Sequence, residues 1–159
     1  MKTASIKEMR QELNEKSTKE LIDICLRFSK FKKENKELLT YLLFDSNSEQ
    51  AYIQLIKDII SEEFSVLIGY SYYQRVKGIR KILRITKKYI RYSQKKETQI
   101  ELLIFFCHEL NQSNVNIHEG AVSTIFEKQI ESIKKEIQKL HEDLRFDFEM
   151  MLEEYDLVF

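Results

Sequence analysis

The chain has 159 residues, the size of one ordinary domain, and can bury roughly two-thirds of the surface that its unfolded form exposes. Lys and Arg number 26 and Asp and Glu number 26, so the net charge indicates neither a polyanionic nor a membrane partner. The longest apolar run, Leu102 to Cys107, is far shorter than the roughly 20 residues that cross a bilayer, and charges interrupt the N-terminal stretch. We therefore expect no transmembrane span, no signal peptide and a cytoplasmic protein.

The absence of proline, the presence of only three glycines and apolar residues spaced three and four apart predict an all-α protein. We expect a single domain over residues 1–159, with six to seven helices packed as antiparallel hairpins because the connections are short. Either a helical bundle or a short armadillo- or HEAT-like stack of two three-helix units fits this pattern. The predicted helices cover residues 6–15, 18–31, 33–44, 47–68, 72–93, 97–112 and 117–155.

Capping boxes mark several of these helix starts. In this motif a Ser, Thr or Asn and a Glu or Gln three residues later satisfy each other's free backbone amides. Gly69 is placed to end the helix before it in the left-handed conformation. The predicted boxes are Ser17/Glu20, Ser46/Glu49, Ser71/Gln74, Thr98/Glu101 and Asn116/Glu119.

One segment in the first half of the sequence resembles a segment in the second half. Residues 26–44 share their order of basic, acidic and apolar positions with residues 90–107, which predicts an internal duplication of 17–68 and 79–140. The alternative is that any two helical corners rich in Lys, Glu and Leu look alike.

Cys25 and Cys107 each lie in an apolar helical pattern, so we expect both to be buried free thiols in a reducing compartment.

The predicted helix 72–93 has one strongly basic face. Residues 64–96 contain ten Lys and Arg and no acidic residue. At 100° per residue, seven of these cations fall in one arc of about 120°, opposite an apolar arc. This basic face consists of Lys77, Arg80, Lys81, Arg84, Lys87, Lys88 and Arg91.

Three interpretations of the basic face remain open. It could bind the phosphates of a nucleic acid, with flanking tyrosines stacking on unpaired bases. It could bind an anionic membrane surface or a protein partner. Finally, it could bind none of these, and either meet acidic side chains of the same chain or of a second copy or be ordinary solvated charge. The tyrosines are Tyr70, Tyr72, Tyr73 and Tyr92.

The predicted helix 117–155 carries an apolar stripe with near-heptad spacing and an acidic end. A helix of this length would outrun a compact bundle, so it must break near His141 or Asp143, curve around the core, or pair with another chain. Residues 141–159 contain seven acidic residues and only one base, Arg145. The candidate acidic face consists of Glu142, Asp143, Asp147, Glu149, Glu153 and Glu154.

Catalytic, cofactor and metal sites are not expected. His108-Glu109 and His141-Glu142 match half of a zinc-protease motif, but Gln112 and Arg145 stand where its second histidine would be. The histidines share no metal-ligand spacing with the cysteines, and no Gly-rich phosphate loop or nucleophile elbow is present. These absences argue against an enzyme.

The segments 21–26 and 32–44, together with 83–92 and 141–144, resemble a family of uncharacterised bacterial all-helical proteins, a domain of unknown function. The similarity covers most of the chain. It implies the helical fold and the bacterial cytoplasm, and it implies no activity, cofactor or site residue. From the residues themselves we expect a non-catalytic module for protein interaction or self-association, with nucleic-acid binding through the basic helix 75–96 as the alternative.

Overall fold

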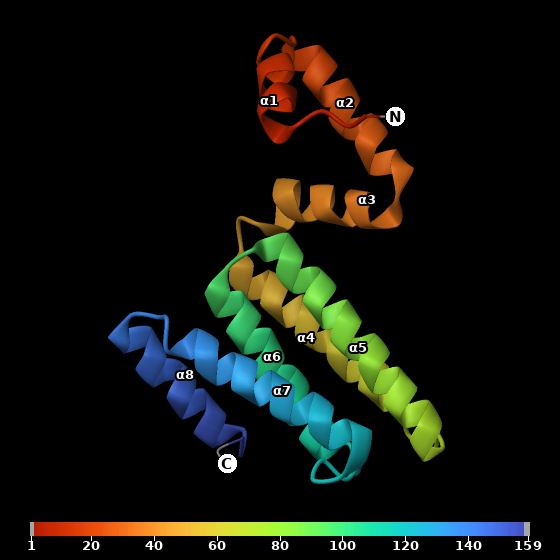
Figure 1. Ribbon diagram of the computed structural model, residues 1–159, viewed down its shortest axis with the longest axis vertical. Helices are drawn as coiled ribbons and strands as arrows, with labels where there is room; N and C mark the ends of the chain where they lie inside the picture. Colours follow the sequence, from red (N-terminus) through yellow and green to blue (C-terminus); the bar gives the residue numbers. More distant parts are fainter. Residues whose placement is uncertain (1, 158–159) are drawn as a thin grey trace. The chain divides into compact units, whose positions relative to one another are not determined.

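A computed structural model describes residues 2–157 (Figure 1). Over these residues the chain forms eight α-helices and no strand, which confirms the all-α class and exceeds the expected count by one. The helices group into two compact units, one ending at Phe44 and the other beginning at Asp45. Within the described residues, no helix is both long and apolar enough to cross a membrane.

The helices of the N-terminal unit are α1 (Ile6–Asn14), α2 (Thr18–Phe31) and α3 (Lys33–Thr40), and a π-helical turn over Tyr41–Asp45 spans the boundary to the next unit. The predicted box at Ser17/Glu20 is present, and a second one joins Ser5 and Glu8. Although α2 packs against α3, no residue of α1, α2 or α3 is buried, and these three helices are described in full. Phe28 is 63% exposed and Phe31 is 78% exposed.

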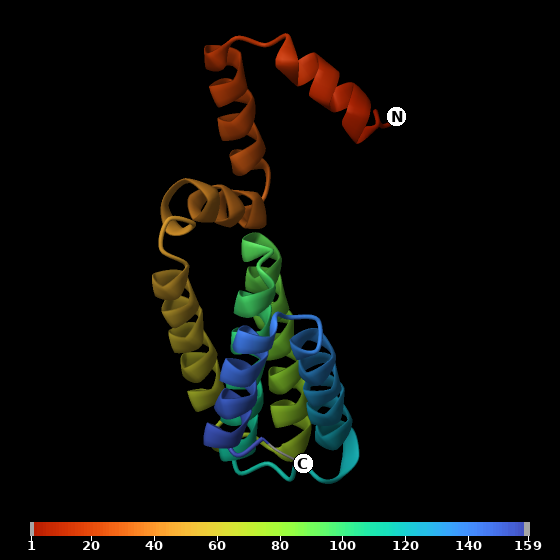
Figure 2. The ribbon, with the colours of Figure 1, turned by 90° about the vertical axis from the view of Figure 1, so that its left-hand side faces the viewer.

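The C-terminal unit is an antiparallel helical bundle of α4 (Glu49–Ser65), α5 (Tyr72–Ser93), α6 (Lys96–Gln112), α7 (Gly120–Ile137) and α8 (Glu142–Glu154). Successive helices reverse direction, as Figures 1 and 2 show. The central helix is α6, which packs against each of the other four. It is buried on almost all sides because its apolar residues do not keep to one face.

The predicted helix 117–155 is two helices, so its prediction as one element is wrong and the break near His141 is the alternative that the structure shows. The amide of Leu140 donates to the carbonyl of Ile137, which tightens and ends α7. His141 then adopts an extended conformation, and its Nδ1 lies 3.5 Å from the amide of Asp143 at the start of α8. The break lets α8 fold back and bury Phe148 and Leu152.

The predicted capping boxes at Ser46/Glu49, Thr98/Glu101 and Asn116/Glu119 are wrong. Ser71/Gln74 forms as Ser17/Glu20 does, but α4 begins after Ser48 and α7 begins after Glu119. Thr98 lies inside α6, where its hydroxyl donates to Glu49 at 2.6 Å. Glu49 also accepts from Ser93 and pairs with Lys95, so this carboxylate joins α4 to the corner between α5 and α6.

The two cysteines differ in their surroundings. Cys107 is fully buried in α6, as expected, and burial raises the pKa of its thiol to about 12. Cys25 is exposed, so the prediction of burial is wrong there. Its apolar pattern belongs to α2, which has no buried residue.

The proposed internal duplication stays a prediction. The corner between α2 and α3 is a single extended residue, Lys32. The corner between α5 and α6 instead has Gln94 in the left-handed conformation followed by extended Lys95. The matching sequence segments therefore turn through different backbone conformations.

Candidate interaction interface

The seven cations of the basic face all lie on α5, opposite the residues that α5 buries. Val76, Ile79 and Ile82 point into the bundle, where each is at most 7% exposed. Six of the cations are exposed, whereas Lys88 is half-buried, with its amino group 4.4 Å from the ring centre of Tyr89. The amphipathic pattern of α5 thus positions a row of positive charge along one side of the C-terminal unit.

Four of these cations line a groove beside α5 with a volume of about 550 Å³. Residues of α5, α6 and α7 form this groove, and no carboxylate is among the lining residues, all of which lie in the described part of the chain. The buried side chains of Ile90 and Leu103 give it an apolar floor. We call it the basic groove; it is lined by Arg80, Leu83, Arg84, Lys87, Ile90, Arg91, Gln99, Leu103 and Ser132.

The contributions of α6 and α7 to the basic groove were missed in the sequence. Ser132 lies far from α5 along the chain, whereas Gln99 follows α5 by one helical corner, and the packing of α6 between α5 and α7 brings both to the groove. Lys128 and Lys135 are exposed one turn before and one turn after Ser132, so they lie on the same flank of α7. The positions of these two lysines, four residues before and three residues after Ser132, are the only sign in the sequence that α7 contributes to the groove.

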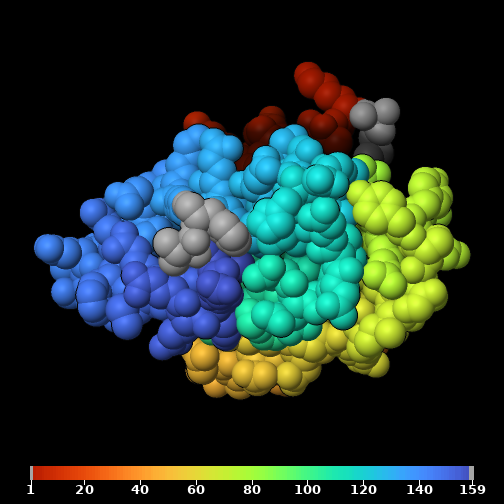
Figure 3. Space-filling view, turned by 90° about the horizontal axis from the view of Figure 1, so that it is seen from below, coloured from red at the N-terminus to blue at the C-terminus, as the bar shows by residue number. Residues whose placement is uncertain are grey.

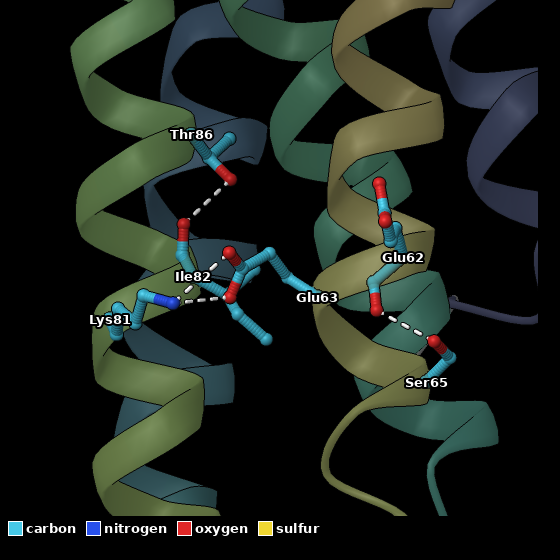
Figure 4. Close-up of polar contacts among 6 residues, drawn as sticks. All are labelled: Glu62, Glu63, Ser65, Lys81, Ile82 and Thr86. Atoms are coloured by element: carbon cyan, nitrogen blue, oxygen red, sulfur yellow. Dashed lines mark hydrogen bonds and ion pairs between the residues drawn. The ribbon is translucent and has the colours of Figure 1, made fainter.

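A second groove, of about 470 Å³, lies on the α4 side of α5 and includes a carboxylate. Lys81 Nζ lies 2.7 and 3.0 Å from the two carboxylate oxygens of Glu63 on α4 (Figure 4). Lys77 lines this groove, and Arg80 and Arg84 line both grooves. The expectation that cations meet acidic residues of the same chain therefore holds at Lys81.

The tyrosines near α5 are not all available for stacking. Tyr72 and Tyr73, at the start of α5, are 55% and 78% exposed, and Tyr70 is 44% exposed. Tyr92 is buried and makes an edge contact with Tyr89, with ring centres 5.7 Å apart. The expectation that Tyr92 stacks on a base is therefore wrong.

The acidic face belongs to α8. Phe148 and Leu152 anchor this helix to the bundle, so all six carboxylates of the face are exposed. Arg145 does not neutralise them, because its Nη2 donates to the carbonyls of Gln138 and Leu140 at 3.3 and 3.5 Å. Two apolar side chains, Phe146 and Met150, lie among the acids and are 64% and 43% exposed.

The acidic face and the basic groove do not meet within one chain. The views agree that α8 and α5 lie on opposite sides of the C-terminal unit, and Figure 3 shows the α6–α7 segment between them. Among residues 2–157, no ion pair joins a residue of α5 to a residue of α8. Internal pairing of these two helices is therefore not what the structure shows.

The histidines, cysteines and acids of the described chain form no group of three or more that could hold a metal ion. His108 packs against Tyr155 with ring centres 4.6 Å apart. This contact joins α6 to the end of α8.

Comparisons with known proteins add no relative. No protein-family model, no curated protein and no solved structure matches this chain significantly.

Proposed function

We propose that this chain is a non-catalytic interaction module that holds an acidic amphipathic helix of a protein in the basic groove. The observation that carries the proposal is the composition of the groove, in which four cations rim an apolar floor and no lining residue is a carboxylate. We also propose that it works in the cytoplasm, since the unpaired buried thiol of Cys107 suits a reducing compartment.

An acidic helix uses both parts of this groove. Its carboxylates would pair with Arg80, Arg84, Lys87 and Arg91, which follow one another at spacings of four, three and four residues along α5. Its apolar side chains would enter between α5 and α7, over Leu103. Helix-in-groove recognition works in this way, because apolar anchors supply affinity and the charged rim supplies orientation and specificity.

Nucleic-acid binding is the second candidate. The observation that favours it is the extension of positive charge onto α7 through Lys128 and Lys135, with exposed Tyr72 and Tyr73 at the start of α5. Phosphates need only the cations, however, and would leave the apolar floor of the groove unused.

The test is a titration of the full chain against three fluorescent probes across a salt series. The probes are a synthetic amphipathic helical peptide of Glu and Leu, a single-stranded DNA and a DNA duplex. We expect the peptide to bind best and the Arg84→Glu variant to weaken it about tenfold or more, because close interfacial ion pairs are worth more than 1 kcal/mol.

The matched control is Lys77→Glu. Lys77 is an exposed cation on the same helix, but it lines the groove on the α4 side. Peptide binding that depends on Arg84 and not on Lys77 supports the proposal. Tighter binding of DNA, weakened by both variants and falling steeply with salt, would replace it with the second candidate. If neither probe class binds, the groove has neither role.

A further inference from the structure

We infer that the partner of the basic groove is a second copy of this chain, which inserts the acidic face of its α8. This inference rests on the proposed function of the groove and names its occupant. The chain carries both halves of the contact, and its own fold keeps them apart on opposite sides of the C-terminal unit (Figure 3).

The spacing of charges on the two surfaces matches. The groove cations Arg80, Arg84, Lys87 and Arg91 are separated by four, three and four residues. Two rows on α8 repeat these intervals, and each has three carboxylates and one apolar residue. The rows are Asp143, Asp147, Met150 and Glu154, and Glu142, Phe146, Glu149 and Glu153.

The dimensions match as well. The cations span about 17 Å along α5, and α8 from Glu142 to Glu154 spans about 18 Å, at 1.5 Å of rise per residue. Each row contributes one exposed apolar side chain, Met150 from the first and Phe146 from the second. In the complex, these two side chains contact the apolar floor of the other copy's basic groove, which Ile90 and Leu103 form.

Each charged surface keeps charges that no ion pair of the described chain neutralises. Glu149 and Glu153 share a groove with Lys134 of α7, and Asp143 lies 3.5 Å from His141, but Asp147 and Glu154 make no ion pair among residues 2–157. The one base on α8, Arg145, turns to the carbonyls at the end of α7, and none of the residues lining the groove is acidic within the described chain. An α8 anchored by Phe148 and Leu152 cannot reach its own groove without leaving the core. The complementary charges can therefore meet only between copies.

This contact is head-to-tail. Because α5 and α8 lie on opposite sides of the C-terminal unit (Figures 1 and 3), a copy binds one neighbour through its groove and another through its acidic face. Such contacts extend past a dimer, into a ring where the rotation closes and into an open chain where it does not.

The experiment measures the mass of the full chain by sedimentation from micromolar to millimolar concentration, at low and high salt. Two variants separate the surfaces: a groove variant, Arg84→Glu with Arg91→Glu, and a helix variant, Asp147→Lys with Glu154→Lys. In both pairs the positions are seven residues apart, so the reversed charges keep the same separation of about 10.5 Å.

We expect the wild-type chain to exceed the mass of a dimer as its concentration rises, and added salt to reverse this. Each variant alone should associate at least about tenfold more weakly. An equimolar mixture of the two should regain association, because every contact between unlike variants is again complementary. The variant that carries all four substitutions should associate with itself, without a second variant present. The control variants Lys77→Glu and Glu62→Lys, exposed charges away from both surfaces, should behave as wild type.

A wild-type chain that stays monomeric overturns this inference. Binding of the acidic peptide by the same chain would then leave the proposed function standing, whereas no peptide binding would remove both. Association that persists in the groove variant, or that the mixture does not restore, overturns the inference too, because the chain would then associate through another surface.

Discussion

At the scale of single residues, Gly78 shows how closely α5 approaches the end of α4. A Cβ built on Gly78 would lie 2.3 Å from Cδ2 of Leu67, a side chain that is itself buried. The glycine lies within a helix, where it costs about 1 kcal/mol relative to alanine. Its position therefore reflects close packing at this crossing, a question that the sequence left open.

The effect of Gly78→Ala on the free energy of unfolding is expected to change sign with the residue at position 67. In the wild-type chain the methyl group forces Leu67 from its place, and overpacking of this kind costs about 1–3 kcal/mol, which outweighs the gain in helix propensity. In a Leu67→Ala background the space is free, so the same change should stabilise by about 1 kcal/mol. Urea denaturation of the four chains measures both effects. Equal effects in the two backgrounds would contradict the packing argument.

The conformation of a residue could be predicted from the sequence where it depends on neighbouring residues alone, and its burial could not. Gly69 adopts a φ of 87°, as its place after a helical pattern indicates. Cys25 and Cys107 sit in similar apolar patterns, yet only Cys107 is buried, because burial depends on which helices surround a residue. That information is not contained in the pattern itself.

At the scale of elements, Glu49 joins three helices. Its carboxylate accepts hydrogen bonds from Ser93 and Thr98 and lies 2.9 Å from the amino group of Lys95. Thr98 is 1% exposed and Ser93 is 9% exposed, so both hydroxyl groups are buried donors that use this carboxylate as their acceptor.

Glu49→Ala is expected to lower the free energy of unfolding by about 2–3 kcal/mol, because it leaves two buried hydroxyl groups without their acceptor. Lys95→Ala should cost less than about 1 kcal/mol, since the Lys95 side chain is half exposed. Adding Thr98→Val to Glu49→Ala should recover part of the loss. Chemical denaturation measures each value, and a Lys95→Ala effect as large as that of Glu49→Ala would contradict this assignment.

Helix bounds were predicted well where local signals are strong. The predicted ranges 18–31 and 72–93 coincide with α2 and α5, each of which starts at a capping box. The same local signals placed a helix start wrongly where the polar residue bonds to another helix and does not cap its own. Thr98 looks like a cap and instead bonds to Glu49, and Glu101 pairs with Lys57 at 2.6 Å.

At the scale of the whole molecule, the sequence predicted the basic face but not the basic groove. Helical periodicity places Arg80, Arg84, Lys87 and Arg91 on one side of α5. The wall from α7 depends on a contact between segments more than 30 residues apart, which brings Ser132 near Arg84, and the wall from α6 depends on how that helix packs after the corner at Gln94 and Lys95. The opposite placement of the acidic face likewise follows from the break at His141, which turns α8 back against α6.

The two units differ in how their helices are stabilised. In the C-terminal unit, Leu102, Ile104 and Phe106 of α6 are fully buried. In the N-terminal unit, α1 has nine residues and α2 has 14, and neither buries a residue although both are fully described. Helices shorter than about 12–15 residues are marginal in water without tertiary packing.

We therefore expect amide hydrogen exchange in the full chain to be fastest in α1 and α2 and slowest in α6. Opening of α6 should require nearly the full free energy of global unfolding, because it exposes the centre of the bundle, whereas α1 can open at almost no cost. Peptide-resolved mass spectrometry measures both, and Phe106→Ala, which should cost about 3–5 kcal/mol, is the control that accelerates exchange in α6 and not in α1. Protection of α2 equal to that of α6 would contradict the expectation, since it would mean that the exposed apolar side chains of α2 are covered in solution.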